Sequence, residues 1–170
     1  MAKRRIIPTA CLIFAVLLVL SSCVASFRDD ISSVTGLDVS AKATVTYTNS
    51  HSGFLGDGAT AVTMTFIDSS LTDQIEKNEH WHKFPMSTNV AVALYGGTAE
   101  NGAEWSSVVR DLSDFEMPEI ANGYWFFRDR HPQKSDEYDD TEMFSRASFN
   151  FVISVYDADT ETLYYFKIDT

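Results

Sequence analysis

The chain has 170 residues, of which 45% are hydrophobic and 13% aromatic. This composition is typical of a globular protein and excludes an intrinsically disordered one, and the length fits a single domain. Acidic residues number 24 and lysines plus arginines 13, which gives a formal net charge of −11. Because nucleic-acid binding needs clustered basic residues and the chain has no such cluster, we expect no nucleic-acid partner.

Residues 1–22 have the features of a signal peptide. Lys3, Arg4 and Arg5 precede an uninterrupted hydrophobic run over residues 10–20. A helix of that length rises only about 16 Å, roughly half the hydrocarbon core of a membrane, so the run is too short to span comfortably. The pattern predicts that the chain after residue 22 is exported.

The hydrophobic run ends in Leu20-Ser21-Ser22-Cys23, an aliphatic residue and two small residues before a cysteine. This sequence resembles the lipobox of bacterial lipoproteins. The resemblance implies cleavage before Cys23, a diacylglycerol group on its sulfur, and attachment to membrane lipid on the extracytoplasmic face of the cell membrane. The alternative is an ordinary secretory signal cleaved after Ala25 or Ser26, which would give a secreted protein. Either way Cys11 is removed, and the folded domain contains no free thiol.

Three segments resemble stretches of small bacterial lipoproteins, a group with no known activity that could be transferred to this chain. They are Ser52–Gly58, Asn122–His131 and Tyr156–Thr170. The resemblance supports only the compartment and a single domain.

Residues 23–42 are expected to form the lipidated N-terminus and a lead-in to one acidic domain over residues 43–170. Four apolar residues of the lead-in recur at helical spacing and predict a short helix ending near Gly36. They are Phe27, Ile31, Val34 and Leu37.

Alternation of apolar residues with threonine predicts strands over residues 43–49 and 60–67, joined by a wide loop over 52–58. In the second strand, Val62, Met64 and Phe66 are expected to face the core. Aromatic and β-branched residues predict further strands over 124–128, 146–156 and 163–168, with a turn over 157–161 and a solvated acidic loop over 132–142.

Three helices are expected between these groups of strands. The first covers residues 68–79, with Ser70 and Asp73 at capping-box spacing. The second covers 87–95, where alternating valines also fit a strand but Ser87 and Gly96 favour helix caps. The third is indicated by the helical spacing of Trp105, Val108, Val109 and Leu112.

Together these elements predict an α+β domain with a mainly antiparallel sheet of about five strands. Short helices would cover one face of the sheet, and polar side chains would occupy the other.

Histidines and aspartates are the main candidates for chemistry. His51, Asp57, Asp129 and His131 lie on or next to loops and could form the centre of a metal-assisted hydrolase, if they converge. His80 and His82 alternate around Trp81, so in an extended segment both imidazoles would point the same way and could bind a metal.

For each of these residues a role in shaping a loop is the commoner use, and no HExxH or Walker pattern occurs. Residues 136–142 and 157–161 are rich in carboxylates but lack the spacing of an EF-hand. We therefore expect no cofactor and no assigned metal site.

The segment Tyr124-Trp125-Phe126-Phe127 has two alternating aromatic faces. One face should belong to the core, and the other could stack on a glycan or peptide; Trp125 and Phe127 are the candidates. Burial of both faces is the alternative.

The leading functional hypothesis is a membrane-anchored, non-enzymatic binding or accessory module of the cell envelope, whose partner is an envelope protein, glycan or peptide. The first alternative is the hydrolase described above. The second is an inhibitor or immunity-type protein that binds a basic partner, because the chain from Cys23 onward has 10 basic and 24 acidic residues and a net charge of −14.

Overall fold

The computed structural model describes residues 27–50, 57–110, 112, 115–131 and 136–170. The chain divides into two compact units, Met1–Ser40 and Ala41–Thr170. In the first unit, residues 27–35 are helical. Gly36 follows with φ 72°, and its N–H donates to the Ser32 carbonyl at 3.0 Å. The predicted helix ending near Gly36 is therefore confirmed. Among the described residues, no helix is both long enough and apolar enough to cross a membrane.

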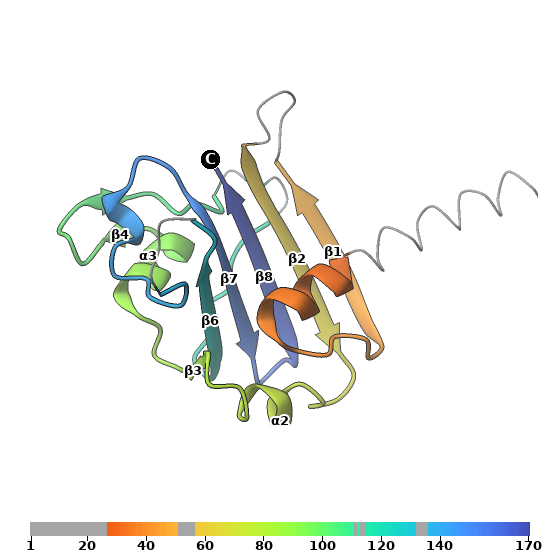
Figure 1. Ribbon diagram of the computed structural model, residues 1–170. Coiled ribbons are helices and arrows are strands. Elements are labelled where there is room, and N and C mark those ends of the chain that lie inside the picture. Colours follow the sequence, from red (N-terminus) through yellow and green to blue (C-terminus); the bar gives the residue numbers. More distant parts are fainter. Residues whose placement is uncertain (1–26, 51–56, 111, 113–114, 132–135) are drawn as a thin grey trace, which may run out of the picture. The chain divides into compact units, whose positions relative to one another are not determined.

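The second unit is built on a six-stranded sheet in which all neighbouring strands are antiparallel (Figure 1). Its strands are β1 Ala43–Asn49, β2 Gly58–Phe66, β3 Trp81–Lys83, β6 Gly123–Asp129, β7 Asn150–Asp157 and β8 Thr162–Asp169. They lie in the order β1-β2-β8-β7-β6-β3. The predicted α+β class and mainly antiparallel sheet are confirmed. β3 was not predicted, because three residues are too few to show an alternating pattern.

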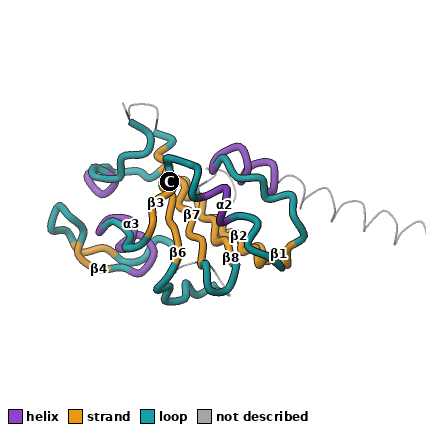
Figure 2. The backbone as a smooth tube through the Cα atoms, turned by 90° about the horizontal axis from the view of Figure 1, so that it is seen from below, coloured by secondary structure: helices purple, strands orange, loops and turns teal. Residues whose placement is uncertain are grey.

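A second, two-stranded sheet pairs β4 (Gly97–Thr98) with β5 (Glu104–Trp105). The helices of this unit are α2 (Thr72–Ile75), α3 (Thr88–Tyr95) and the 3-10 turn η2 (Met143–Ser145). Figure 2 shows α3 and β4 close together to one side of the large sheet.

α3 begins and ends where its caps predict. The Ser87 hydroxyl accepts a hydrogen bond from the Val90 N–H at 3.1 Å, and Gly96 ends the helix at φ 81°. This cap satisfies one N–H of the first turn, and a left-handed glycine ends a helix at little steric cost.

The other two helix predictions are wrong in extent or type. Residues 68–79 contain only the single turn of α2, whose N-cap Leu71 makes no side-chain cap hydrogen bond. The Asp68 carboxylate instead accepts from the Ser70 N–H and forms a local turn. Residues 105–112 are not helical where the structure describes them, because Trp105 pairs with Gly97 in the β4–β5 hairpin.

One face of the large sheet packs against α3 and the segments around β4, β5 and η2. The apolar residues of this cluster include Val90 and Leu94 of α3 and Met143 and Phe144 of η2. The strands contribute Ala59, Ala61, Trp125, Phe127, Phe151, Ile153, Val155, Phe166 and Ile168. The helix-covered face predicted from the sequence therefore exists.

The opposite face is also buried, so the prediction of a polar face is wrong for the central strands. Its fully or almost fully buried residues are Val62, Met64, Phe126, Val152, Ser154, Tyr156, Leu163 and Tyr165. Within this unit, Thr72 of α2 lies next to Tyr156, whose hydroxyl also donates to Glu161. In strands covered on both faces, apolar residues occupy both alternating positions. The apolar–polar alternation that predicts a half-buried strand is therefore weak.

A glycine permits the close approach of β6 and β7. A Cβ placed on Gly123 would lie 2.1 Å from the Tyr156 carbonyl oxygen, far inside van der Waals contact. Gly123 pairs with Asp157 at the first position of the β6–β7 ladder. This pairing therefore requires a residue without a side chain at position 123.

We predict that Gly123→Ala lowers the free energy of unfolding by about 2 to 4 kcal/mol, because the methyl group must push the two strands apart. Urea denaturation measures the change. Gly102→Ala is the matched control, since a Cβ there meets nothing within 4 Å and adds only the strain of its φ of 81°. Equal losses in the two variants would contradict the predicted clash.

Candidate functional site

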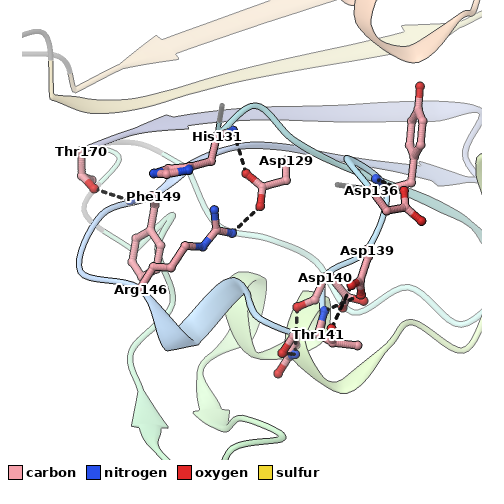
Figure 3. Close-up of polar contacts among 11 residues, drawn as sticks. Asp129, His131, Asp136, Asp139, Asp140, Thr141, Arg146, Phe149 and Thr170 are labelled. Atoms are coloured by element: carbon pink, nitrogen blue, oxygen red, sulfur yellow. Dashed lines mark hydrogen bonds and ion pairs between the residues drawn. The ribbon is translucent and has the colours of Figure 1, made fainter. Parts of the chain in front are cut away.

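Asp129, the last residue of β6, is the centre of a buried polar cluster (Figure 3). Its carboxylate accepts a hydrogen bond from the His131 backbone N–H at 2.9 Å, and the other oxygen accepts from the Arg146 guanidinium. The Asp129 side chain is fully buried, whereas that of Arg146 is 20% exposed. Both carboxylate oxygens therefore serve the loop that leaves β6, and neither faces solvent as a general base would require.

A second ion pair lies at the same end of the sheet. The Arg130 guanidinium donates to Asp169 at the end of β8, and the Arg130 N–H donates to the Asn150 carbonyl at the start of β7. Arg146 and Arg130 thus tie the ends of three adjacent strands together. Four buried polar atoms at this end of the sheet have no hydrogen-bond partner within the described part of the chain: Nε of Arg130, Nε and Nη1 of Arg146, and Oδ1 of Asn150.

The structure does not bring Asp57 close to Asp129. Asp57 precedes β2 and is exposed, and the strand order puts β8 and β7 between β2 and β6. Three strand spacings of about 4.8 Å separate the two backbones by about 14 Å. His51 lies outside the described residues. For the described residues, the convergence expected of the hydrolase is not observed.

His80 and His82 make separate aromatic contacts. The His80 ring stacks on Tyr138 with centroids 3.5 Å apart, and Tyr138 in turn contacts Phe126. The His82 ring lies 4.7 Å from that of Trp125. Because Phe126 and Trp125 point to opposite faces of β6, the two imidazoles rest on opposite sides of the sheet. No group of three histidine, cysteine or acidic side chains suited to a metal occurs in the described ranges.

The described part of the predicted acidic loop, residues 136–142, is irregular and exposed or half-buried, and it is also tied to α3. The Asp140 carboxylate accepts from the Ser87 hydroxyl, and the Asp140 carbonyl accepts from the Asn89 amide at 3.0 Å. Asn89 is 1% exposed, and its side-chain oxygen also accepts from the Glu100 N–H. One buried amide therefore joins α3, the acidic segment and the β4–β5 turn.

Two other aspartates of the carboxylate-rich segments, Asp139 and Asp157, form local turns. Asp139 accepts from the N–H and hydroxyl of Thr141, both at 3.0 Å. In the β7–β8 turn, Asp157 accepts from the Asp159 N–H at 2.9 Å and from the Thr160 hydroxyl at 2.8 Å. The predicted turn over 157–161 is confirmed.

Trp125 and Phe127 do not form an open platform. Trp125 is 9% exposed and Phe127 1%, and both belong to the cluster beneath α3. The Trp125 indole N–H donates to the Pro85 carbonyl at 3.2 Å. Phe126, on the other alternating face, is 1% exposed. Burial on both faces, the alternative, is therefore what the structure has.

A hollow beside α3 has both aromatic and charged side chains in its lining. We call it the α3 hollow; its volume is about 500 Å3, within the usual range for ligand sites. It is lined by Leu94, Tyr95, Gly96, Gly97, Trp105, Ser106, Ser107, Val109, Arg110, Phe115, Glu116 and Met117. The sequence does not predict the hollow, because much of its lining comes from the segment incorrectly predicted as a helix.

Hydrogen bonds between α3 and the following segment shape the hollow. The Val108 N–H donates to the Ala93 carbonyl at 2.9 Å, and the Ser107 hydroxyl donates to the Leu94 carbonyl at 2.7 Å. Gly96 allows this approach, since a Cβ there would meet the Ser107 nitrogen and the Trp105 oxygen at 3.2 Å.

Tyr95 forms part of the rim of the α3 hollow and is 41% exposed. Its hydroxyl donates to the Pro118 carbonyl at 2.9 Å. Partial burial, and then the negative charge of Glu119, raises the pKa of Tyr95 above its usual value. The phenol therefore stays neutral and donating at physiological pH.

Trp105 contributes the largest ring of the hollow and stacks on Phe144 with centroids 4.9 Å apart. Its indole nitrogen is buried and has no partner among the residues that the structure describes. Phe115 adds a second apolar ring, but more of the exposed lining is polar than apolar, and Arg110 and Glu116 supply opposite charges.

Cys23, the candidate lipidation residue, lies outside the described residues. No family model, curated protein or solved structure matches the chain.

We predict that Asp129→Asn lowers the free energy of unfolding by about 2 to 4 kcal/mol, because it leaves the largely buried Arg146 without its counter-charge. Asp169→Asn is the control: the Asp169 side chain is 30% exposed, so loss of its pair with Arg130 should cost at most about 1 kcal/mol. Urea denaturation compares them. A smaller loss for Asp129→Asn than for Asp169→Asn would show that the buried pair does not hold this end of the sheet.

Proposed function

We propose that the chain is a bacterial lipoprotein held on the extracytoplasmic face of the cell membrane through Cys23. Support comes from the order of features along the sequence: basic residues, a short hydrophobic run, and then Leu20-Ser21-Ser22-Cys23. Acyl chains gain about 0.8 kcal/mol for each buried methylene, and two or more chains give lasting attachment.

We further propose that the folded unit is a binding module whose site is the α3 hollow. The observation that carries this proposal is the hollow's mixed lining, in which the Trp105 ring lies among polar groups and the opposite charges of Arg110 and Glu116. A concave site that combines an aromatic ring with polar groups and charges of both signs suits a segment of protein or peptide, which presents apolar side chains and polar backbone together. The partner is therefore an envelope protein or an exported peptide.

The metal-assisted hydrolase has less support. Asp129 is the candidate acid closest in sequence to a histidine, and its two oxygens already bind the His131 N–H and Arg146. A carboxylate that is buried and doubly hydrogen-bonded is suited to fixing a loop rather than to accepting a substrate proton.

Mass spectrometry of the mature N-terminus tests the anchor. We expect the wild-type protein to begin at Cys23 with acyl groups attached, and the Cys23→Ala variant to carry none. Cys11→Ala is the matched control and should be acylated like the wild type, because residue 11 belongs to the removed segment. An unprocessed N-terminus in the wild type, or a mature chain that lacks acyl groups, would contradict the proposal.

Capture from detergent-solubilised membranes tests the hollow. Tyr95→Ala alters its rim, and Tyr47→Ala changes an equally exposed tyrosine of β1, with side chains 41% and 42% exposed. We expect a partner that the wild type and Tyr47→Ala retain and that Tyr95→Ala loses at least tenfold. A partner retained equally by all three, or no partner in repeated captures, would count against the binding module.

A further inference from the structure

A second hollow adjoins the α3 hollow at Tyr95, which belongs to the lining of both. We call it the Glu119 hollow; its volume is about 380 Å3. It is lined by Met86, Tyr95, Glu119 and Ile120. A ligand that fills the α3 hollow can therefore extend across the Tyr95 ring into the Glu119 hollow.

The apolar walls of the Glu119 hollow are held by contacts within the fold. Met86 and Ile120 are half-buried and pack against the apolar cluster beneath α3. The Tyr95 hydroxyl donates to the Pro118 carbonyl at 2.9 Å, which ties the ring to the segment that carries Glu119. These walls are thus in place before a ligand binds.

Glu119 gives this hollow its charge. The residue is exposed, and within the described part of the chain its carboxylate has no hydrogen bond and no ion pair. Its negative charge helps to raise the pKa of Tyr95, so the carboxylate lies within electrostatic reach of that ring. In the α3 hollow Arg110 offsets Glu116, whereas the described lining of the Glu119 hollow has no basic residue. The Glu119 hollow therefore favours a cation.

Lysine and arginine are the side chains that match this lining. Their apolar stems pack along apolar surface, here Met86 and Ile120, while the charged head stays at the boundary with water. The head can then pair with the Glu119 carboxylate, and a cation over the face of a tyrosine is attracted to the ring as well.

The lead-in of the chain itself does not supply this cation. Residues 23–40 contain one basic residue, Arg28. The Arg28 guanidinium donates to the Val39 carbonyl within the same compact unit. The cation therefore comes from a separate molecule.

We propose that the partner segment carries a lysine or arginine whose side chain occupies the Glu119 hollow and pairs with Glu119. This inference rests on the binding module proposed above and names the charge that its partner must present. The neighbouring part of the segment fills the α3 hollow. Glu119 is then the residue that selects for a basic side chain in the partner.

A phage-displayed library of random seven-residue peptides, selected on the detergent-solubilised full-length chain, tests the proposal. Peptides selected by the wild type should be enriched in lysine or arginine at one position. Glu119→Lys should instead select aspartate or glutamate there, because the charge of the hollow is reversed. Glu79→Lys is the matched control, since it makes the same change of charge at a glutamate whose side chain is 88% exposed, and it should select the same peptides as the wild type.

Titration with one peptide selected by the wild type then measures the ion pair. Glu119→Gln should weaken binding about three- to fivefold, the scale of a partly exposed ion pair, and added salt should weaken wild-type binding more than that of the variant. Selected peptides without a basic preference, or equal binding by the wild type and Glu119→Gln, would overturn the proposal. The binding module would still stand in that case if Tyr95→Ala lost the peptides. Failure to select any peptide would contradict both.

Discussion

Burial of both faces of the central strands is the constraint on which the rest of the structure depends. In β7, six consecutive residues from Phe151 to Tyr156 are buried, although their side chains alternate between the two faces. From Phe151 to Tyr156, β7 therefore offers no exposed side chain to a ligand. The candidate binding site lies instead in the segments around α3.

Buried polar groups hold those peripheral segments against the apolar core. Asn89 bonds to the acidic segment and to the β4–β5 turn, and Asp129 bonds to Arg146 and to the chain leaving β6. Each bond satisfies a group that would otherwise cost free energy on burial. The aspartates that were candidates for catalysis or metal binding thus serve mainly to shape loops.

The sequence predicts the parts of the fold that depend on local patterns. Alternation identified β1 and β2, aromatic and β-branched runs identified β6, β7 and β8, and Ser87 and Gly96 marked the ends of α3. What it could not predict depends on distant contacts. Trp105 joins a hairpin with Gly97 despite helical spacing of its apolar neighbours, β3 exists only because β6 lies beside it, and Trp125 is buried by α3. The α3 hollow was missed for the same reason.

The central claim is that the aromatic residues of β6 fill a core covered on both faces, and that Trp105 in the α3 hollow is the accessible tryptophan. Quenching of tryptophan fluorescence by acrylamide tests it, because Trp81 and Trp125 are only 6% and 9% exposed. The account predicts one quenchable component in the wild type that disappears in Trp105→Phe. Quenching that persists unchanged in Trp105→Phe would place Trp81 or Trp125 at the surface and contradict the account.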